Sequence, residues 1–216
     1  MKKVLFGISL TAMLLLLVAT ATPSFATSLP PGGSVAPTLD GGPFTQLAYT
    51  GPISFSFAGD TGSVQEWVGN VSGLTNPYPG GLAFIYQFTV TSGIIDSLSA
   101  FNFGSFLTDA QYATCGLPTC FAFGGTQIQP PNATRSPDGS VVQFNWLATP
   151  VGAGETTMAL EIFTNATTFY GGSIGLLDGG GGTFAGFSPV PEPATLSLLG
   201  TGLLALAGSL RKKLFS

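Results

Sequence analysis

Short runs in which apolar and polar residues alternate recur along the middle of the chain. Residues 53–57 read ISFSF, with Ile53, Phe55 and Phe57 on one side of the run and serines on the other. Such a period of two predicts a half-buried strand. Residues 63–71 repeat the pattern, and the side chains of Val64, Glu66 and Val68 should share one face.

The longest alternating run, residues 82–91, predicts the best strand of the protein. Its even-numbered positions from Leu82 to Val90 are all apolar, and Ile85 on the other side indicates that both faces are covered near its start. Residues 94–103, 140–148, 156–164 and a last stretch from Leu176 carry similar patterns between turn signals.

No part of this region holds the i, i+3, i+4, i+7 apolar stripe of a helix for three turns. Strands with turns about every ten residues predict an all-β fold, an antiparallel β-sandwich of jelly-roll type, over residues 44–188. Residues 27–43 are rich in Pro and Gly and have no apolar period, so we expect a leading arm there.

The N-terminus has the order of a secretory signal peptide. Lys2 and Lys3 precede an apolar run over residues 4–18, and Ser24-Phe25-Ala26 offers the small-x-small pattern that signal peptidase accepts. We expect residues 1–26 to direct export and to be cleaved after Ala26 by signal peptidase. The alternative is an uncleaved anchor helix.

The net charge of residues 27–188, which we call the body, differs from that of the two chain ends. Residues 27–188 hold one basic residue, Arg135, against nine acidic ones, a formal charge of −8 compared with −4 for the whole chain. Such a body cannot neutralise a row of phosphates, so nucleic acid is excluded as a partner. The same charge repels anionic lipid headgroups.

The chain contains no histidine. This excludes Ser-His-Asp and Cys-His catalysis and every histidine-bearing metal site. A carboxylate pair is the remaining acid–base option, but Glu155 and Glu161 fall in a turn and on a strand, and nothing singles them out as a glycosidase pair. We therefore expect solvated acids on turns and outer faces, and no enzyme.

Asp-Gly pairs begin at Asp40, Asp138 and Asp178. These predict turns, since calcium sites need several oxygens at short spacing. A contribution to a Ca²⁺ site is the alternative, and we expect no metal site and no cofactor.

The two cysteines, Cys115 and Cys120, enclose Gly-Leu-Pro-Thr. In an exported chain this spacing favours a local disulfide, which would pin one loop and contribute about 2 kcal/mol. A redox dithiol or a metal site is the less favoured alternative.

Aromatic residues are abundant, and Trp67 and Trp146 fall inside predicted strands, as core residues do. Tyr78 is in a predicted loop, and Tyr170 follows a polar stretch. Exposed aromatic rings stack on sugars in carbohydrate-binding modules, so these two tyrosines are candidate glycan contacts. Asn-x-Ser/Thr triplets at Asn70, Asn132 and Asn165 are interpreted as ordinary polar positions.

The C-terminus has an apolar segment at residues 194–210, 17 residues without a charge. As a helix it would be about 25 Å long, slightly short of a ~30 Å hydrocarbon core. Arg211, Lys212 and Lys213 follow it at once and should stay on the cytoplasmic side, leaving the body outside. We expect a marginal transmembrane helix.

A plain anchor does not require the triplet Pro191-Glu192-Pro193 that precedes the apolar segment. Triplet, glycine-containing apolar helix and basic cluster together resemble the PEP-CTERM sorting signal of Gram-negative bacteria, over residues 189–213. The resemblance implies that an exosortase recognises Pro191, Glu192 and Pro193 and cleaves near them, while Arg211, Lys212 and Lys213 retain the tail. Here the chain continues for three residues beyond the basic cluster, whereas the family's tails often end on arginines.

Together these features predict a non-enzymatic exported protein. It would be held briefly in the inner membrane by its tail, sorted by an exosortase and delivered to the cell surface or the extracellular matrix. A structural or adhesive role in exopolysaccharide or biofilm is the first hypothesis. A carbohydrate-binding module and a carboxylate-dependent hydrolase are the alternatives.

Overall fold

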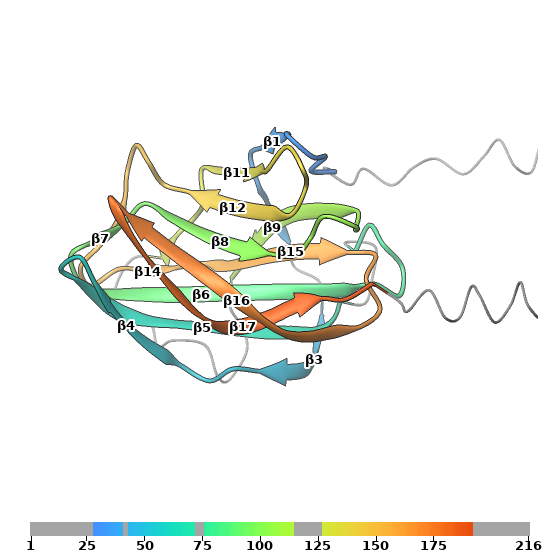
Figure 1. Ribbon diagram of the computed structural model, residues 1–216, viewed down its shortest axis with the longest axis horizontal. Helices are drawn as coiled ribbons and strands as arrows, with labels where there is room; N and C mark the ends of the chain where they lie inside the picture. Colours follow the sequence, from blue (N-terminus) through green and yellow to red (C-terminus); the bar gives the residue numbers. More distant parts are fainter. Residues whose placement is uncertain (1–27, 41–42, 72–75, 115–126, 192–216) are drawn as a thin grey trace, which may run out of the picture.

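The computed structural model describes residues 28–40, 43–71, 76–114 and 127–191 (Figure 1). These residues form strands and turns and include no helix, so the all-β prediction is confirmed. Two sheets carry most of the strands, and nearly all neighbouring strands run antiparallel. Parallel pairings join β2 to β9 and β10 to β14.

One sheet has six strands in the order β1 (Ser34–Val35), β11 (Asn132–Arg135), β12 (Val141–Asn145), β8 (Ser97–Phe101), β16 (Phe169–Asp178) and β17 (Gly180–Pro189). The second sheet has nine strands and includes the series β10 (Gln127–Ile128), β14 (Thr156–Thr157), β6 (Leu82–Ser92), β15 (Ala159–Thr164), β9 (Thr108–Ala113) and β2 (Thr38–Asp40). It is completed by β5 (Asp60–Val71), which pairs with β6, and by β3 (Phe44–Tyr49) and β4 (Ile53–Phe57), which pair with β5. A small third sheet joins β13 (Val151–Gly152) to β7 (Ile94–Ile95).

The main core lies between the two large sheets. From the nine-stranded sheet it takes the even-numbered residues of β6, Leu82 to Val90, and from the six-stranded sheet it takes residues such as Leu98, Phe144 and Ile174. Edge-to-face ring contacts join Phe84 to Phe103 and Phe88 to Trp146. The arrangement is that of a β-sandwich.

A second cluster covers the other face of the nine-stranded sheet. Trp67, Ile85 and Phe163 are buried there, on the side of their strands that faces away from the main core. The sequence predicted this double coverage of β6 from the apolar residue at position 85, and the structure confirms it. A strand that is covered on both faces needs apolar residues at both its odd-numbered and its even-numbered positions.

Two predicted strands are interrupted. Residues 94–103 divide at Asp96, whose N–H donates to the Leu177 carbonyl 2.8 Å away and whose carbonyl accepts from the Trp146 N–H at 2.7 Å. Residues 156–164 divide at Met158, whose N–H bonds to the Ile128 carbonyl. In both cases the backbone hydrogen bonds of the interrupting residue go to another segment, which alternation of side chains cannot predict.

Residues 28–40, expected to belong to a leading arm, contribute to both sheets. Leu29 is fully buried, β1 pairs with β11 in one sheet, and β2 pairs with β9 in the other. These pairings need no alternating pattern of their own, because they supply backbone hydrogen bonds to strands that are already formed. The sandwich therefore begins before residue 44.

The described chain starts and ends at the same end of the sandwich (Figure 1). Ser28 and Asn165 line one pocket there, and Val190 is hydrogen-bonded to Thr168. We call this end the tail-side pole. The turns between β4 and β5, β6 and β7, and β16 and β17 lie at the opposite end, the far pole (Figure 1).

Candidate functional site

Most of the predicted sorting and processing residues lie outside the described part of the chain. This applies to Ala26, to Cys115 and Cys120, to Glu192 and Pro193, to the apolar segment 194–210, and to Arg211, Lys212 and Lys213. Of the sorting triplet, the structure describes Pro191, which is exposed. Within the described ranges, the structure has no helix of the length and apolarity needed to cross a membrane.

The sorting triplet begins one residue after the last strand ends. Pro189 ends β17, is buried and pairs in register with Phe169. Val190 donates its N–H to the Thr168 carbonyl at 3.1 Å, and its own carbonyl accepts from the Thr168 hydroxyl at 3.0 Å. The folded body thus holds the chain up to Val190 and releases it at Pro191.

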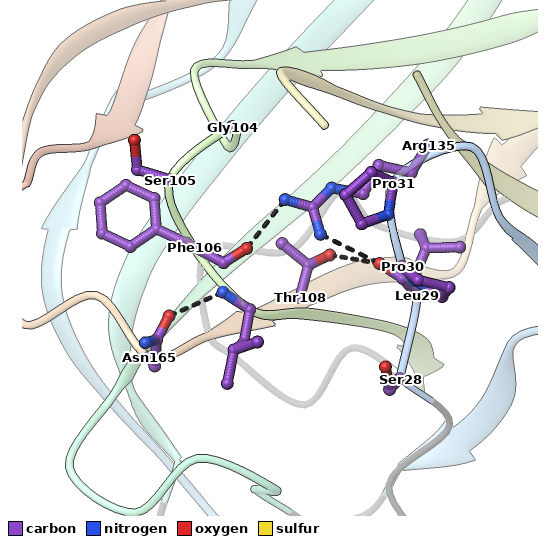
Figure 2. A pocket seen from close by; sticks show the side chains of 11 residues that line it. Ser28, Leu29, Pro30, Pro31, Gly104, Ser105, Phe106, Thr108, Arg135 and Asn165 are labelled. Carbon is purple, nitrogen blue, oxygen red and sulfur yellow. Dashed lines mark hydrogen bonds between the residues drawn. The ribbon is translucent and has the colours of Figure 1, made fainter. Parts of the chain in front are cut away.

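A pocket of about 460 Å³ opens at the tail-side pole (Figure 2). Its walls come from the start of the described chain, from the loop between β8 and β9, and from the loop after β15. It is lined by Ser28, Leu29, Pro30, Pro31, Gly104, Ser105, Phe106, Leu107, Thr108, Arg135 and Asn165. This volume is within the range of sites that take small ligands.

Arg135, the only basic residue of the body, forms part of this pocket and is 5 % exposed. Its Nη1 donates to the Leu29 carbonyl at 3.1 Å, and its Nη2 donates to the carbonyls of Phe103 and Phe106 at 2.8 Å each. Its Nε donates to the Gly139 carbonyl at 2.9 Å. One guanidinium therefore joins three loops, two of which appear beside it in Figure 2.

The remaining polar groups of the pocket are neutral. Asn165 is exposed, and its side-chain oxygen accepts the Leu107 N–H at 2.8 Å (Figure 2). The Thr108 hydroxyl donates to the Leu29 carbonyl at 2.9 Å. The described residues that line the pocket include no acid. Their hydroxyl and amide groups can hydrogen-bond to an uncharged ligand.

The two candidate glycan contacts lie in different parts of the sandwich. Tyr78 precedes β6, packs against the second cluster and is only partly exposed. Burial and the neighbouring Asp109 raise the pKa of Tyr78 to about 12, against the opposing effect of Arg135. Tyr170 is on β16 and is 77 % exposed. The rings of these two tyrosines are not in contact with each other.

The prediction that the acids are solvated is wrong for four of them. Asp60, Glu66, Asp109 and Glu161 are each 5 % exposed or less. Glu161 does face away from Leu160 and Ile162, as predicted, but the second cluster buries that face of the sheet. The sequence placed Glu66 and Glu161 on the correct side of their strands, but it could not show that the side of β15 that carries Glu161 is also covered.

Glu66 is one of the two fully buried acids of this group. It lies between Val64 and Val68 on the inner side of β5, and its Oε2 accepts the Phe187 N–H from β17 at 2.7 Å. Burial raises the pKa of Glu66 to about 8, against the lowering effects of Phe187 and the Tyr86 phenol. The Tyr86 hydroxyl, from the paired position of β6, interacts with the Glu66 carboxyl and is buried with it. Burial and Glu66 in turn raise the Tyr86 pKa well above its usual value.

Three acids interact at the far pole. Asp60 begins β5, is 3 % exposed and accepts the Ile94 N–H on Oδ1 at 3.0 Å, while its Oδ2 has no partner. Burial raises the pKa of Asp178, and the nearby carboxylates of Asp60 and Asp96 raise it further. Within the described ranges, no three His, Cys, Asp or Glu residues form a group suited to hold a metal ion.

Glu155 is not part of a catalytic pair with Glu161 in any visible cleft. Its Oε2 accepts the Gly152 N–H at 2.7 Å, closing the turn between β13 and β14, whereas Glu161 is buried beneath the second cluster on β15. Neither residue lines the pocket at the tail-side pole.

Sequence reasoning missed Arg135 as an organising residue and Glu66 as a buried acid. For each, a signal was present. Arg135 is the lone basic residue of a strongly acidic body, and Glu66 occupies an inward position in an alternating run. The pocket itself had no signal, because loops distant in sequence form it.

Comparison with known proteins identifies the tail. Residues 189–212 match the model of the PEP-CTERM protein-sorting motif. The chain therefore carries this sorting motif, which supports export, membrane-anchored transit and targeting to an exosortase. No curated protein and no solved structure matches the chain.

Proposed function

We propose that this chain is a non-enzymatic protein of the bacterial cell surface or extracellular matrix, with a structural or adhesive role in exopolysaccharide or biofilm. Residues 1–26 direct its export and are removed by signal peptidase after Ala26. The apolar segment 194–210 then holds it in the inner membrane until an exosortase cleaves near Pro191-Glu192-Pro193. The observation that carries the proposal is the sorting-motif match at residues 189–212.

The end of the fold supports this role for the triplet. Because Thr168 holds Val190 with two hydrogen bonds and Pro191 is exposed, the triplet begins where the folded body stops. Proline fixes φ and disfavours helix in the residue before it, so the triplet should present an extended backbone to an enzyme. Cleavage there would release an intact sandwich.

A substitution in the triplet tests the proposal. In a host that contains an exosortase, Glu192→Ala should leave the chain in the membrane fraction at its uncleaved mass. The native chain should lose the tail and appear outside the inner membrane. Thr183→Ala, an exposed change on β17, is the matched control and should mature normally. Normal maturation of the Glu192 variant, measured by intact mass and fractionation, would contradict the proposal.

The pocket at the tail-side pole favours a second candidate function, the binding of a neutral saccharide. Its hydroxyl and amide groups can hydrogen-bond to sugar hydroxyls, and no carboxylate lines it. The formal charge of −8 on the body disfavours polyanionic glycans. A screen of the mature chain against neutral oligosaccharides tests this candidate, and the absence of binding to all of them would remove it.

A further inference from the structure

The tail-side pole lies at the point where the chain passes toward the membrane. We infer that this pole rests directly on the phospholipid headgroups while the tail is inserted, and that its uncharged surface is a docking face for zwitterionic lipid. The inference rests on the proposed function, in which the segment 194–210 spans the inner membrane. It adds the orientation of the body and the surface that touches the lipid.

The first step is that the tether is short. Pro189 is buried and Val190 is held by Thr168, and the sequence places three residues, Pro191, Glu192 and Pro193, between Val190 and Ala194. A residue spans at most about 3.6 Å, which limits the distance from Val190 to Ala194 to about 14 Å. The headgroup layer on each side of the hydrocarbon core is about 5–8 Å thick. The pole therefore cannot stand far above the headgroups.

The second step is that the other chain end is fastened at the same pole. Ser28 forms a β-bridge with Asp109, and the Leu29 N–H donates to the Thr108 carbonyl at 2.8 Å. The Leu29 carbonyl accepts from both Thr108 and Arg135. Residues at the beginning of the body consequently form part of the surface and do not separate it from the membrane.

The third step is the chemistry of the surface. Its exposed members carry no charge, and Leu107 and Val190 are 58 % and 36 % exposed. They are Ser28, Pro30, Pro31, Gly104, Ser105, Leu107, Asn165, Thr167, Thr168, Val190 and Pro191. Arg135 is buried beneath them, so its guanidinium does not present a phosphate-binding site to solvent. An uncharged surface with exposed apolar side chains loses little hydration when it meets the headgroup layer.

The fourth step decides the lipid class. Asp138, on the adjoining β11–β12 hairpin, is exposed, and the body as a whole carries −8. Both features oppose contact with an anionic surface. Asp60, Asp96 and Asp178 lie at the far pole, away from the tail, whereas Asp109 at the tail-side pole is fully buried. Zwitterionic headgroups are the partner that this distribution fits.

Site-specific photo-crosslinking of the full chain tests the inference. Two matched leucines, Leu107 at the tail-side pole and Leu147 next to Trp146, are each replaced by a photoreactive phenylalanine. Leu147 is 75 % exposed, and the Trp146 N–H bonds to the Asp96 carbonyl near the far pole. Both chains are reconstituted in phosphatidylcholine vesicles, and resistance to carbonate extraction reports tail insertion separately. Mass spectrometry then measures protein–lipid adducts.

The expected result is several-fold more lipid adduct at position 107 than at 147 in chains whose tail is inserted. Equal adduct at the two positions in inserted chains would overturn the docking face and leave the sorting proposal intact. Failure of the tail to insert would defeat the proposed function, and this inference with it. More adduct at 107 in phosphatidylglycerol vesicles than in phosphatidylcholine would overturn the assigned lipid class.

Discussion

The two poles of the sandwich close the same pair of sheets with opposite chemistry. At the tail-side pole, Arg135 satisfies four carbonyls with one buried cation. At the far pole, Asp178 lies near the carboxylates of Asp60 and Asp96, and one oxygen of Asp60 has no partner. Arginine keeps its charge at every accessible pH, whereas a carboxylate group that faces others becomes less repulsive when it binds a proton.

This difference indicates which end of the molecule should change its stability with pH. The tail-side pole is held by hydrogen bonds whose strength does not change with pH. The far pole has hairpin tips that meet through like charges, so its local stability should vary with acidity.

The largest effect should come from breaking the tail-side pole. Arg135→Met removes all four hydrogen bonds and leaves the carbonyls of Phe106 and Gly139 without a donor. The carbonyls of Leu29 and Phe103 keep one hydrogen bond each, from the Thr108 hydroxyl and the Phe106 N–H. An unsatisfied buried polar group costs about 1–3 kcal/mol, so two of them should lower the free energy of unfolding by at least about 2 kcal/mol. Urea unfolding of the mature chain measures this change.

Arg135→Lys is the informative companion variant, because it keeps the charge and loses the planar fork. It should recover only part of the stability that Arg135→Met loses. Full recovery by lysine would show that charge alone, and not the four-way hydrogen bonding, holds this pole. A loss below about 1 kcal/mol in the methionine variant would show that the pole is not held by Arg135.

Glu66 belongs to neither pole. A substitution there tests whether the pH dependence of the free energy of unfolding is confined to the far pole. The pKa of Glu66 is raised from 4.5 to about 8 in the folded protein, so the folded state keeps a proton that the unfolded state loses above pH 4.5. The stabilisation is complete below pH 4.5 and is lost as pH rises toward 8, by about 3 kcal/mol between pH 5 and 8. Glu66→Gln should flatten this slope in unfolding curves recorded across that range.

Val64→Ile is the control variant, because it changes a neighbouring residue of β5 and leaves the Glu66 carboxyl in place. Val64→Ile should change stability by a similar amount at every pH. A slope in Glu66→Gln equal to that of the native chain would show that another group carries the pH dependence.

The smallest effect compares two hairpin aspartates, one near each pole. Hydrogen bonds from Ser136 and Ser140 lower the pKa of Asp138 to about 2, whereas burial and the carboxylates of Asp60 and Asp96 raise the pKa of Asp178. At pH 7, Asp138→Asn should therefore lower the melting temperature slightly, and Asp178→Asn should raise it.

The two effects should also depend on pH in opposite ways. The contribution of Asp138 is present at neutral pH and is lost as pH falls toward 2, because its folded pKa is lowered. The benefit of Asp178→Asn should shrink in acid, where native Asp178 binds a proton of its own. Melting curves at pH 4 and 7 measure both trends, and shifts of the same sign in the two variants would remove the contrast between the poles.

Alternation in the sequence predicted strands such as β5, β6 and β12 with their inward residues, but it did not predict β3, β9 or β11. The even positions of β6 face the main core, and Trp67 and Trp146 are fully buried, as their place in predicted strands indicated. A strand with one set of apolar residues has one stable way to present them, so a local pattern determines which side faces inward. The sorting tail was also predictable, because a sorting motif is defined by the order of its residues, and residues 189–212 match the motif model.

Only the tertiary structure decided what covers each surface. Alternation placed Glu161 opposite Leu160, but the second cluster, formed by residues as distant as Trp67, turned that outer face into a buried one. Residues 28–40 had no strand pattern and became part of both sheets by pairing with β11 and β9. Arg135 acquired its role because carbonyls from residue 29 to residue 139 converge on it. Burial, edge pairing and convergence depend on contacts between segments far apart in the chain, and a local pattern contains no information about them.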